Sequence, residues 1–354
     1  MRRVVVCGVG VVALVSLGIF ATFLPGSHRE PGSPSQPSNV AAAHAAFPAA
    51  APAAPQAVAA LAAAGRAQLG PAPPESGATK APWPPAAKVV AGPPCQTPGA
   101  LGVARVVEID TTGGPGFGFQ HFKAYDFLNP GEVVLTFDDG PWPINTPAVL
   151  AALAAQCAKA TFFAIGKHAV WHPEILRQVA AAGHTIGSHT WSHVDLVKKS
   201  PAEAKDEIEK GISAVRAALA APYAPFFRFP ELRHPPEMMT YLESRNIAMF
   251  STDIDSFDFR IKNPDQIITS VMGKLKKDGK GIILMHDFQR ATAQALPELL
   301  SELKANGYKI VQLTAKSSIE TLPEYDAMMS QEIKGGTASA RPTASVVRTV
   351  SEGN

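Results

Sequence analysis

Between residues 132 and 313, short apolar runs alternate with segments of helical periodicity, and this alternation constrains the fold more than any other feature. Each apolar run is short and rich in β-branched or aromatic residues, as buried strands are. Consecutive strand and helix units imply parallel strands that are covered by helices. The predicted strands are 132–137, 160–165, 184–188, 226–229, 247–251, 281–285 and 308–313.

The alternation by itself fits either an open doubly wound sheet or a closed barrel. A nucleotide-binding sheet would carry a glycine-rich phosphate loop after its first strand, and no such loop follows residues 132–137. We therefore predict an α/β fold with a single catalytic domain, a distorted (β/α)7-type barrel of parallel strands. In such a barrel the chemistry collects at the C-terminal ends of the strands.

Local signals predict where several helices begin. Ser200 and Glu203 have the spacing of a capping box, in which each side chain bonds the backbone of the other residue. Asn263 stands before a proline at another predicted helix start, and Thr146 does so after the first strand. We expect each of these three residues, Ser200, Asn263 and Thr146, to be an N-cap.

The N-terminal segment predicts export. Residues 1–24 begin with two arginines after Met1 and then run uncharged from Val4 to Leu24, as a signal sequence or an N-terminal membrane anchor does. The arginines favour a cytoplasmic N-terminus. We expect the rest of the chain in the periplasm or cell envelope, either secreted or tethered to the inner membrane by residues 4–24.

Composition divides the remainder into three parts. Residues 25–98 are rich in alanine and hold half of the chain's 32 prolines, which predicts a disordered linker. Residues 99–315 are the predicted catalytic domain, and they are enough for a substantial core. Residues 316–354, rich in serine, threonine and glycine, are predicted to be a low-complexity C-terminal tail.

Charge and cysteine content limit the partners and the compartment. A net charge of +2 gives no reason to expect nucleic acid, and no protein partner is evident. Export would place Cys95 and Cys157 in an oxidising compartment, where disulfides persist. We predict a disulfide between them, joining the end of the linker to the domain.

Polar side chains follow several of the predicted strands and would meet at one mouth of the barrel. They are Asp138 and Asp139 after the first strand, His189 and His193 after the third, Arg228 in the fourth, Asp258 after the fifth and His286 after the sixth.

The paired aspartates and the paired histidines suggest a metal site. Asp138 and Asp139 point to different sides of the backbone, so one could hold a metal while the other acts as a base. The alternative is that they only open a turn before Gly140. His189 and His193 are four apart, so their rings would face the same way on a helical turn. Two imidazoles and a carboxylate suit a divalent ion such as zinc, with positions left for water.

The same residues resemble five ordered motifs of the polysaccharide deacetylases, the NodB-homology domain of carbohydrate esterase family 4, and in particular a bacterial, exported branch. The resemblance covers about residues 130–315. It implies a metal-dependent hydrolase that removes N-acetyl groups from N-acetylglucosamine-containing polysaccharide or oligosaccharide, peptidoglycan or chitin-like, and releases acetate. The motifs are Thr136-Phe-Asp-Asp-Gly-Pro141, His189-Thr-x-x-His193, Arg228-x-Pro230, Asp255-x-x-Asp258 and Leu284-x-His286.

The resemblance also implies a role for each motif residue. Asp139, His189 and His193 would hold the metal, with zinc as the default and cobalt or manganese possible in the same geometry. Asp138 would take a proton from the attacking water. Arg228 would orient the carboxylate of Asp138.

The remaining roles concern the leaving amine and the oxyanion. His286 would protonate the amine, with Asp258 holding its ring, and the backbone N–H of Glu231 would stabilise the oxyanion. This chain departs from the family at two places: Phe259 replaces a usual tryptophan, and Glu231-Leu232 replaces a more common tyrosine or glycine. Substrate identity is therefore less tightly implied than reaction type.

Two other functions compete with N-deacetylation of a glycan. An esterase acting on O-acetylated polysaccharide would use the same site. A catalytically silent glycan-binding protein, tethered to the membrane, would be expected to have lost the base or a metal ligand. All of these residues are present in the sequence.

Overall fold

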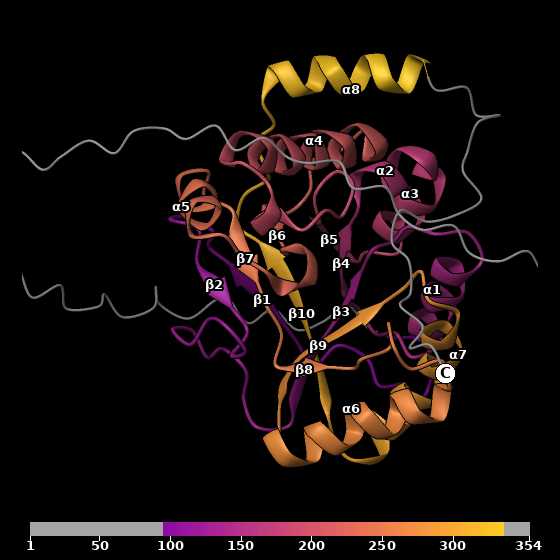
Figure 1. Ribbon diagram of the computed structural model, residues 1–354. Coiled ribbons are helices and arrows are strands. Elements are labelled where there is room, and N and C mark those ends of the chain that lie inside the picture. Colours follow the sequence, from indigo (N-terminus) through magenta and orange to yellow (C-terminus); the bar gives the residue numbers. More distant parts are fainter. Residues whose placement is uncertain (1–94, 336–354) are drawn as a thin grey trace, which may run out of the picture. The chain divides into compact units, whose positions relative to one another are not determined.

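The computed structural model describes residues 95–335, so the predicted signal or anchor and nearly all of the predicted linker lie outside the described residues. The predicted strands and helices are present as a series of β/α units (Figure 1). The strands are β1 Arg105–Ile109, β2 Gly116–Phe117, β3 Glu132–Asp138, β4 Thr161–Ala164, β5 Thr185–Ser188, β6 Phe226–Phe227, β7 Ala248–Phe250, β8 Ile254–Asp255, β9 Gly281–His286 and β10 Lys309–Ala315. The α-helices are α1 Asn145–Ala155, α2 Gly166–Trp171, α3 Pro173–Ala181, α4 Pro201–Leu219, α5 Pro236–Ser244, α6 Pro264–Asp278, α7 Arg290–Ala305 and α8 Pro323–Gly335.

Every strand pairing in this region is parallel, which confirms the α/β prediction. The ladder runs β1-β10-β3-β4-β5-β6-β7-β2, and β9 pairs with both β3 and β8. Strand β3 lies at the centre, bonded to β4, β9 and β10. Within residues 95–335 no continuous ladder closes the barrel, because β7 and β8 are joined only by the short segment 251–253.

Alternate residues of β3 face different layers. Val133, Leu135 and Phe137 belong to the core under the helices, whereas Val134 belongs to a second core formed by other strand residues. All seven residues of β3 are buried, as expected for a parallel strand covered on both faces. Asp138 follows Val134 by an even number of residues, so the pleat directs its side chain toward the interior.

Two of the three predicted caps are confirmed. The Ser200 hydroxyl caps α4 in a complete capping box, and the Asn263 side chain caps α6. The prediction for Thr146 is wrong, because α1 begins at Asn145 with Ile144 at the N-cap position, two residues earlier than predicted. Its hydroxyl instead accepts from the Trp142 N–H at 2.8 Å and donates to Asp287 Oδ2 at 2.5 Å.

The predicted start of the tail at residue 316 is wrong, because helix α8 continues the folded domain to residue 335. Figure 1 shows α8 across the outer side of α4. Tyr325 and Met329 of α8 are buried, and the Tyr325 hydroxyl donates to Asp206 of α4 at 2.5 Å. A few apolar residues within a polar stretch are enough to attach a helix whose other face is exposed.

The predicted disulfide is confirmed: Cys95 is bonded to Cys157 just after α1. The following chain is held at the same place, since Gln156 accepts from the backbone N–H groups of Leu101 and Gly102. None of the helices in residues 95–335 is long and apolar enough to span a membrane.

Candidate metal-dependent active site

Three predicted ligands meet at the C-terminal end of β3. The Nε2 atoms of His189 and His193 each lie 3.4 Å from Asp139 Oδ1. One candidate ligand atom from each residue lies within 4.8 Å of the others. Asp139 Oδ1 is buried and has no hydrogen-bond partner among the described residues. A buried, unpaired carboxylate oxygen is costly, and a cation held by this donor set would compensate for it.

The backbone at Asp139 is unusual, and its neighbours stabilise it. Asp139 has φ 72°, in the left-handed region that non-glycine residues seldom adopt. Its N–H donates to the Phe163 carbonyl at 3.2 Å, and its own carbonyl lies 2.5 Å from His168 Nδ1. Burial alone would raise the pKa of Asp139, but electrostatic interactions with His193, His286 and His189 lower it below the ordinary value.

His189 and His193 are brought together by a loop and not by the helical turn that their spacing suggested. Thr190 and His193 both have positive φ, 64° and 56°, and the Thr190 hydroxyl accepts from the His193 N–H at 3.0 Å. Helix α4 supports this loop through Glu207, whose carboxylate accepts from the backbone and hydroxyl of Ser192 at 2.9 Å.

The hydrogen bond of His189 determines which of its ring nitrogens is available. Nδ1 lies 2.6 Å from the carbonyl oxygen of Arg228, which can only accept, so Nδ1 carries the proton and Nε2 presents its lone pair. Burial lowers the pKa of His189 to about 4, against the opposing charge of Asp138. A neutral imidazole with a free Nε2 is the form that binds a metal.

Asp138 is held away from the ligand group by a buried arginine. Arg228 is fully buried and donates to Asp138 Oδ1 at 2.7 Å, to the Thr136 hydroxyl at 2.8 Å and to the Ser251 carbonyl at 2.9 Å. Its guanidinium also lies 4.3 Å from the ring centroid of Phe163. The other oxygen of Asp138, Oδ2, is 3.9 Å from His189 Nε2, so the two adjacent aspartates have different partners.

On the other side of Asp139, His286 forms a tight pair with Asp258. His286 Nδ1 lies 2.6 Å from Asp258 Oδ1, and Asp258 Oδ2 accepts from the His286 N–H at 2.7 Å and from the Thr292 hydroxyl at 2.5 Å. Burial would lower the pKa of His286, but Asp258 outweighs it, with help from Asp139, and raises the pKa to about 10. His286 is therefore protonated at neutral pH, with Nε2 3.9 Å from Asp139 Oδ2.

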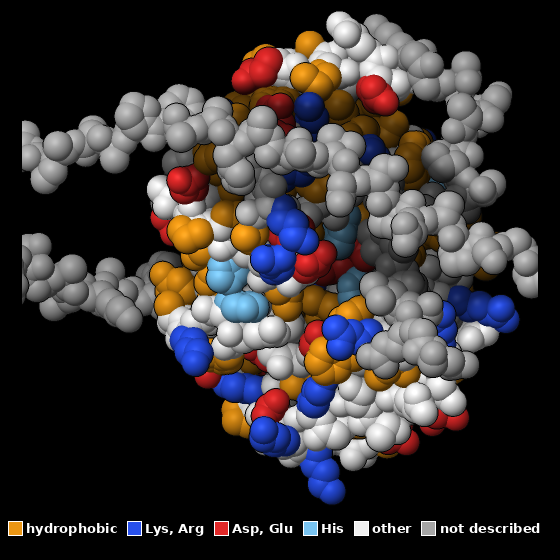
Figure 2. Space-filling model, viewed as in Figure 1, with side chains coloured by type: hydrophobic (Ala, Val, Ile, Leu, Met, Phe, Trp, Pro, Cys, Tyr) orange, Lys and Arg blue, Asp and Glu red, His pale blue; other side chains and the backbone are white. Residues whose placement is uncertain are grey.

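One cavity of about 420 Å³ is lined by the two adjacent aspartates and the three histidines, Asp138, Asp139, His189, His193 and His286. Figure 2 shows acidic and histidine side chains close together near the middle of this face, among basic and apolar ones. Glu231 and Leu232 form part of the wall, both with positive φ. Phe259, at the position where the family usually has tryptophan, presents its ring to His286 at 5.8 Å between centroids.

Three supporting residues were missed from the sequence. They are His168, Asp287 and Gly211, none of which belongs to a motif described above. Asp287 is fully buried beside Gly140, leaving no room for a side chain there, and burial raises its pKa to about 7. Gly211 lets α4 approach the backbone of Thr190. Gly211 is the one of these residues that the sequence could have indicated. A glycine inside a helix costs about 1 kcal/mol of stability relative to alanine, so its presence there suggests a close contact.

Comparison with known proteins identifies relatives of this chain. The chain matches the family model for polysaccharide deacetylases over residues 128–250. It is 31% identical over 199 residues to a chitooligosaccharide deacetylase of a Bradyrhizobium species, covering 52% of this chain and 90% of that protein. It is 32% identical over 205 residues to a peptidoglycan-N-acetylglucosamine deacetylase of Bacillus cereus, covering 56% of this chain and 73% of that protein.

Other relatives share only part of their length with this chain. It is 32% identical to a peptidoglycan-N-acetylglucosamine deacetylase of Listeria monocytogenes over 184 residues, which are 51% of this chain and 38% of that protein. Among solved structures, a peptidoglycan deacetylase of Bdellovibrio bacteriovorus is 34% identical with a TM-score of 0.56, covering 65% of this chain and 64% of that one.

Proposed function

The chain belongs to the polysaccharide deacetylase family, and we propose that it is a metal-dependent hydrolase that removes N-acetyl groups from glycans containing N-acetylglucosamine. The observation that carries this proposal is the buried, unpaired Oδ1 of Asp139, 3.4 Å from two histidine Nε2 atoms. Beside it lie a carboxylate that is held by an arginine and a protonated histidine that is held by a carboxylate. A metal site, a general base and a general acid are the elements of metal-assisted amide hydrolysis.

Asp139, His189 and His193 would hold the metal. A divalent ion bound there supplies a Lewis acid for the acetyl carbonyl and can lower the pKa of water to about 7. We propose zinc, since this donor set suits it. The chain prepares the ligands by burying Asp139 and by fixing the tautomer of His189.

Asp138 would be the general base. Arg228 donates a hydrogen bond to Oδ1 of Asp138, and Oδ2 faces the metal-ligand side of the cavity, near His189. The attacking water gives a proton to this carboxylate while its oxygen bonds to the acetyl carbon. The hydrogen bond from Arg228 to Oδ1 fixes the orientation of the Asp138 carboxylate, which makes Arg228 a positioning residue.

His286 would be the general acid. As the carbon–nitrogen bond breaks, protonated Nε2 of His286 gives its proton to the amine, and acetate and a free amino sugar are released. Asp258 holds the ring through Nδ1 at 2.6 Å. The backbone N–H of Glu231, in the wall of the same cavity, would donate to the oxyanion.

The substrate and the location are also proposals. Relatives that act on peptidoglycan and on chitooligosaccharide support an N-acetylated glycan as the substrate. Residues 1–24 support export to the cell envelope, with a tether to the membrane where they are not removed.

The test is acetate release from chitin oligomers, peptidoglycan and acetylated xylan, before and after chelation and zinc add-back. We expect release from the N-acetylglucosamine polymers, loss on chelation and recovery with metal. Release only from the acetylated xylan would favour the O-acetyl esterase. No release from any of them by the metal-loaded protein would refute the function.

The base assignment has its own test in Asp138→Asn. We expect turnover to fall by about 10²–10⁴-fold with metal content unchanged, because Asp138 accepts the proton without binding the metal. Metal content is measured by elemental analysis and turnover by acetate release. A near-normal rate in a metal-loaded variant would contradict the role of Asp138.

A further inference from the structure

Residues 165–168, which lead from β4 into α2, connect the two loops that carry the candidate metal ligands. One is the aspartate loop, residues 138–141, and the other is the histidine loop, residues 189–193. On the aspartate side, the N–H of Ile165 donates to the Gly140 carbonyl at 3.1 Å. We call residues 165–168 the bridge.

On the histidine side, the bridge is bonded through the first turn of α2. The N–H groups of Gly166 and Lys167 donate to the carbonyls of Thr190 and Trp191, both at 2.9 Å. The first N–H groups of a helix have no partner within the helix, so here the histidine loop supplies the acceptors. The contact is close, since a Cβ atom at residue 166 would lie 2.9 Å from the Trp191 ring. The position of the histidine loop is therefore fixed relative to the bridge.

His168 extends the bridge to Asp139 with its side chain. His168 is fully buried, and its Nδ1 lies 2.5 Å from the carbonyl oxygen of Asp139. A carbonyl oxygen can only accept, so Nδ1 carries the proton and donates. The ring centroids of Trp142 and Trp171 lie 5.0 Å and 5.5 Å from that of the imidazole. These aromatic neighbours restrict the rotation of the His168 ring.

The hydrogen bond from His168 completes the bonding of the Asp139 backbone. The N–H of Asp139 donates to the Phe163 carbonyl, and the residue is buried with φ 72°. Without His168, the buried carbonyl of Asp139 would lose this partner, which is costly, and the peptide would turn to recover one. Such a turn would move Asp139 Oδ1 away from the two histidine Nε2 atoms that lie 3.4 Å from it.

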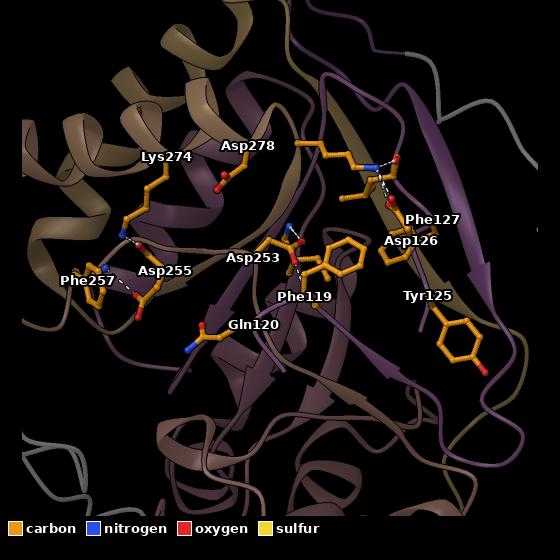
Figure 3. A pocket seen from close by; sticks show the side chains of 14 residues that line it. Phe119, Gln120, Tyr125, Asp126, Phe127, Asp253, Asp255, Phe257, Lys274 and Asp278 are labelled. Carbon is orange, nitrogen blue, oxygen red and sulfur yellow. Dashed lines mark hydrogen bonds and ion pairs between the residues drawn. The ribbon is translucent and has the colours of Figure 1, made fainter. Parts of the chain in front are cut away.

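The bridge lies behind the walls of both large cavities. Figure 3 shows the larger cavity, about 660 Å³, whose wall comes from segments 118–128, 253–257 and 274–282. Among the described residues, the linings of this cavity and of the catalytic cavity include no member of the bridge. A molecule bound in either cavity therefore does not touch His168, and any influence of His168 on the reaction has to pass through Asp139.

We propose that His168 is a positioning residue of the metal centre, which sets the spacing between the carboxylate ligand and the two imidazole ligands and thereby the affinity for the metal. The proposal rests on the proposed metal-dependent function and adds a residue that lies outside the five motifs. Functional groups have to be held within about 0.5 Å of their productive geometry. Outer partners of metal ligands typically contribute about 10–100-fold to metal affinity.

The experiment measures the zinc Kd of the metal-stripped protein by competition with a chromophoric chelator. His168→Phe keeps an aromatic ring beside the two tryptophans and removes the donor to Asp139. We expect its zinc Kd to rise about 10–100-fold. His168→Asn should keep a zinc Kd close to that of the wild type, because the amide nitrogen of asparagine falls near the place of Nδ1 and can donate to the same carbonyl.

The matched control is His184→Phe. His184 is also buried, and its Nδ1 accepts from the Ala160 N–H at 3.2 Å, so this variant loses a buried bond to the backbone outside both ligand loops. It should lower the free energy of unfolding, measured in urea, and leave the zinc Kd unchanged. A wild-type zinc Kd in His168→Phe, or an equal rise in His184→Phe, would overturn the positioning role.

A second pair of variants covers the case in which His168→Phe does not fold. The amide nitrogen of glutamine falls near Nε2 instead of Nδ1, so His168→Gln should bind zinc about tenfold more weakly than His168→Asn. The same zinc Kd in the two amide variants would count against His168. Failure of the wild-type protein itself to bind zinc would instead refute the proposed function.

Discussion

His189 and His286 lie in the same cavity, and their surroundings move their pKa values in opposite directions. Both are buried enough that desolvation lowers the pKa. His189 bonds a neutral backbone carbonyl, which does not offset burial, so its pKa falls to about 4. His286 bonds the carboxylate of Asp258 at 2.6 Å, and its pKa rises to about 10.

The difference shows how one cavity can keep a metal ligand and a proton donor apart. A carbonyl partner orients an imidazole without charging it, and this suits a ligand that must stay neutral. A carboxylate partner orients the ring and stabilises its proton, and this suits a general acid. Whether Nδ1 faces a backbone carbonyl or a carboxylate therefore decides whether the imidazole suits metal binding or proton donation.

The largest effect should come from removing a ligand. In His193→Gln we expect bound metal to be lost and turnover to fall below detection, because only two ligands remain. The control is His184→Gln, which alters a buried histidine between α3 and β5 and should retain full metal content by elemental analysis. Unchanged metal in His193→Gln would remove this residue from the ligand set.

A smaller effect should follow from exchanging the partner of His286. Asp258→Asn removes the charge that raises the pKa of His286 and leaves the burial that lowers it. Since the acid must be protonated, activity is lost as pH rises through this pKa. We expect kcat to fall about 10²-fold at neutral pH and its alkaline limb to move to lower pH, with partial recovery in Asp258→Glu. A uniform loss at every pH would indicate only a structural role.

The smallest effect concerns the stability of the metal-free protein. Because the pKa of His189 is lowered in the folded state, the folded protein binds fewer protons than the unfolded chain between about pH 6.5 and pH 4. Its free energy of unfolding should therefore decrease as pH falls through this window, and His189→Gln should flatten that dependence by about 1–3 kcal/mol.

His286 should show the opposite sign. Its folded pKa is raised to about 10, so its stabilisation is fully present below about pH 6.5 and is lost as pH rises toward 10. His286→Gln should reduce the pH dependence of the free energy of unfolding on the alkaline side and leave the dependence on the acid side unchanged. Urea denaturation of both metal-free variants at a series of pH values measures how the free energy of unfolding depends on pH. The same dependence in both variants would contradict the opposite pKa shifts of His189 and His286.

Much of the fold was predictable because the strands carry their own signals. The apolar runs of β3, β4 and β9 are buried on both faces, so their sequences are continuous and easily found. Strands β1, β2 and β8 were missed. Strands β1 and β2 lie before the alternation begins and pair with β10 and β7, which are far away in sequence, and β8 is only two residues long.

The candidate site was predictable in its members and less so in its geometry. Strand order indicated that Asp139, His189 and His286 would converge. The loop at His193 and the support of Asp139 by His168 could not be read from spacing, because they depend on backbone with positive φ and on a contact 29 residues away.

The disulfide also determines where the preceding chain is joined to the domain. Helix α1 runs back from the mouth, so Cys157 at its end lies near the edge where the strands begin, opposite the edge that carries Asp139. Whatever precedes Cys95 is thus joined to the domain at the end remote from the reaction. The disulfide therefore attaches the preceding chain without occupying the mouth of the barrel, where Asp139 lies.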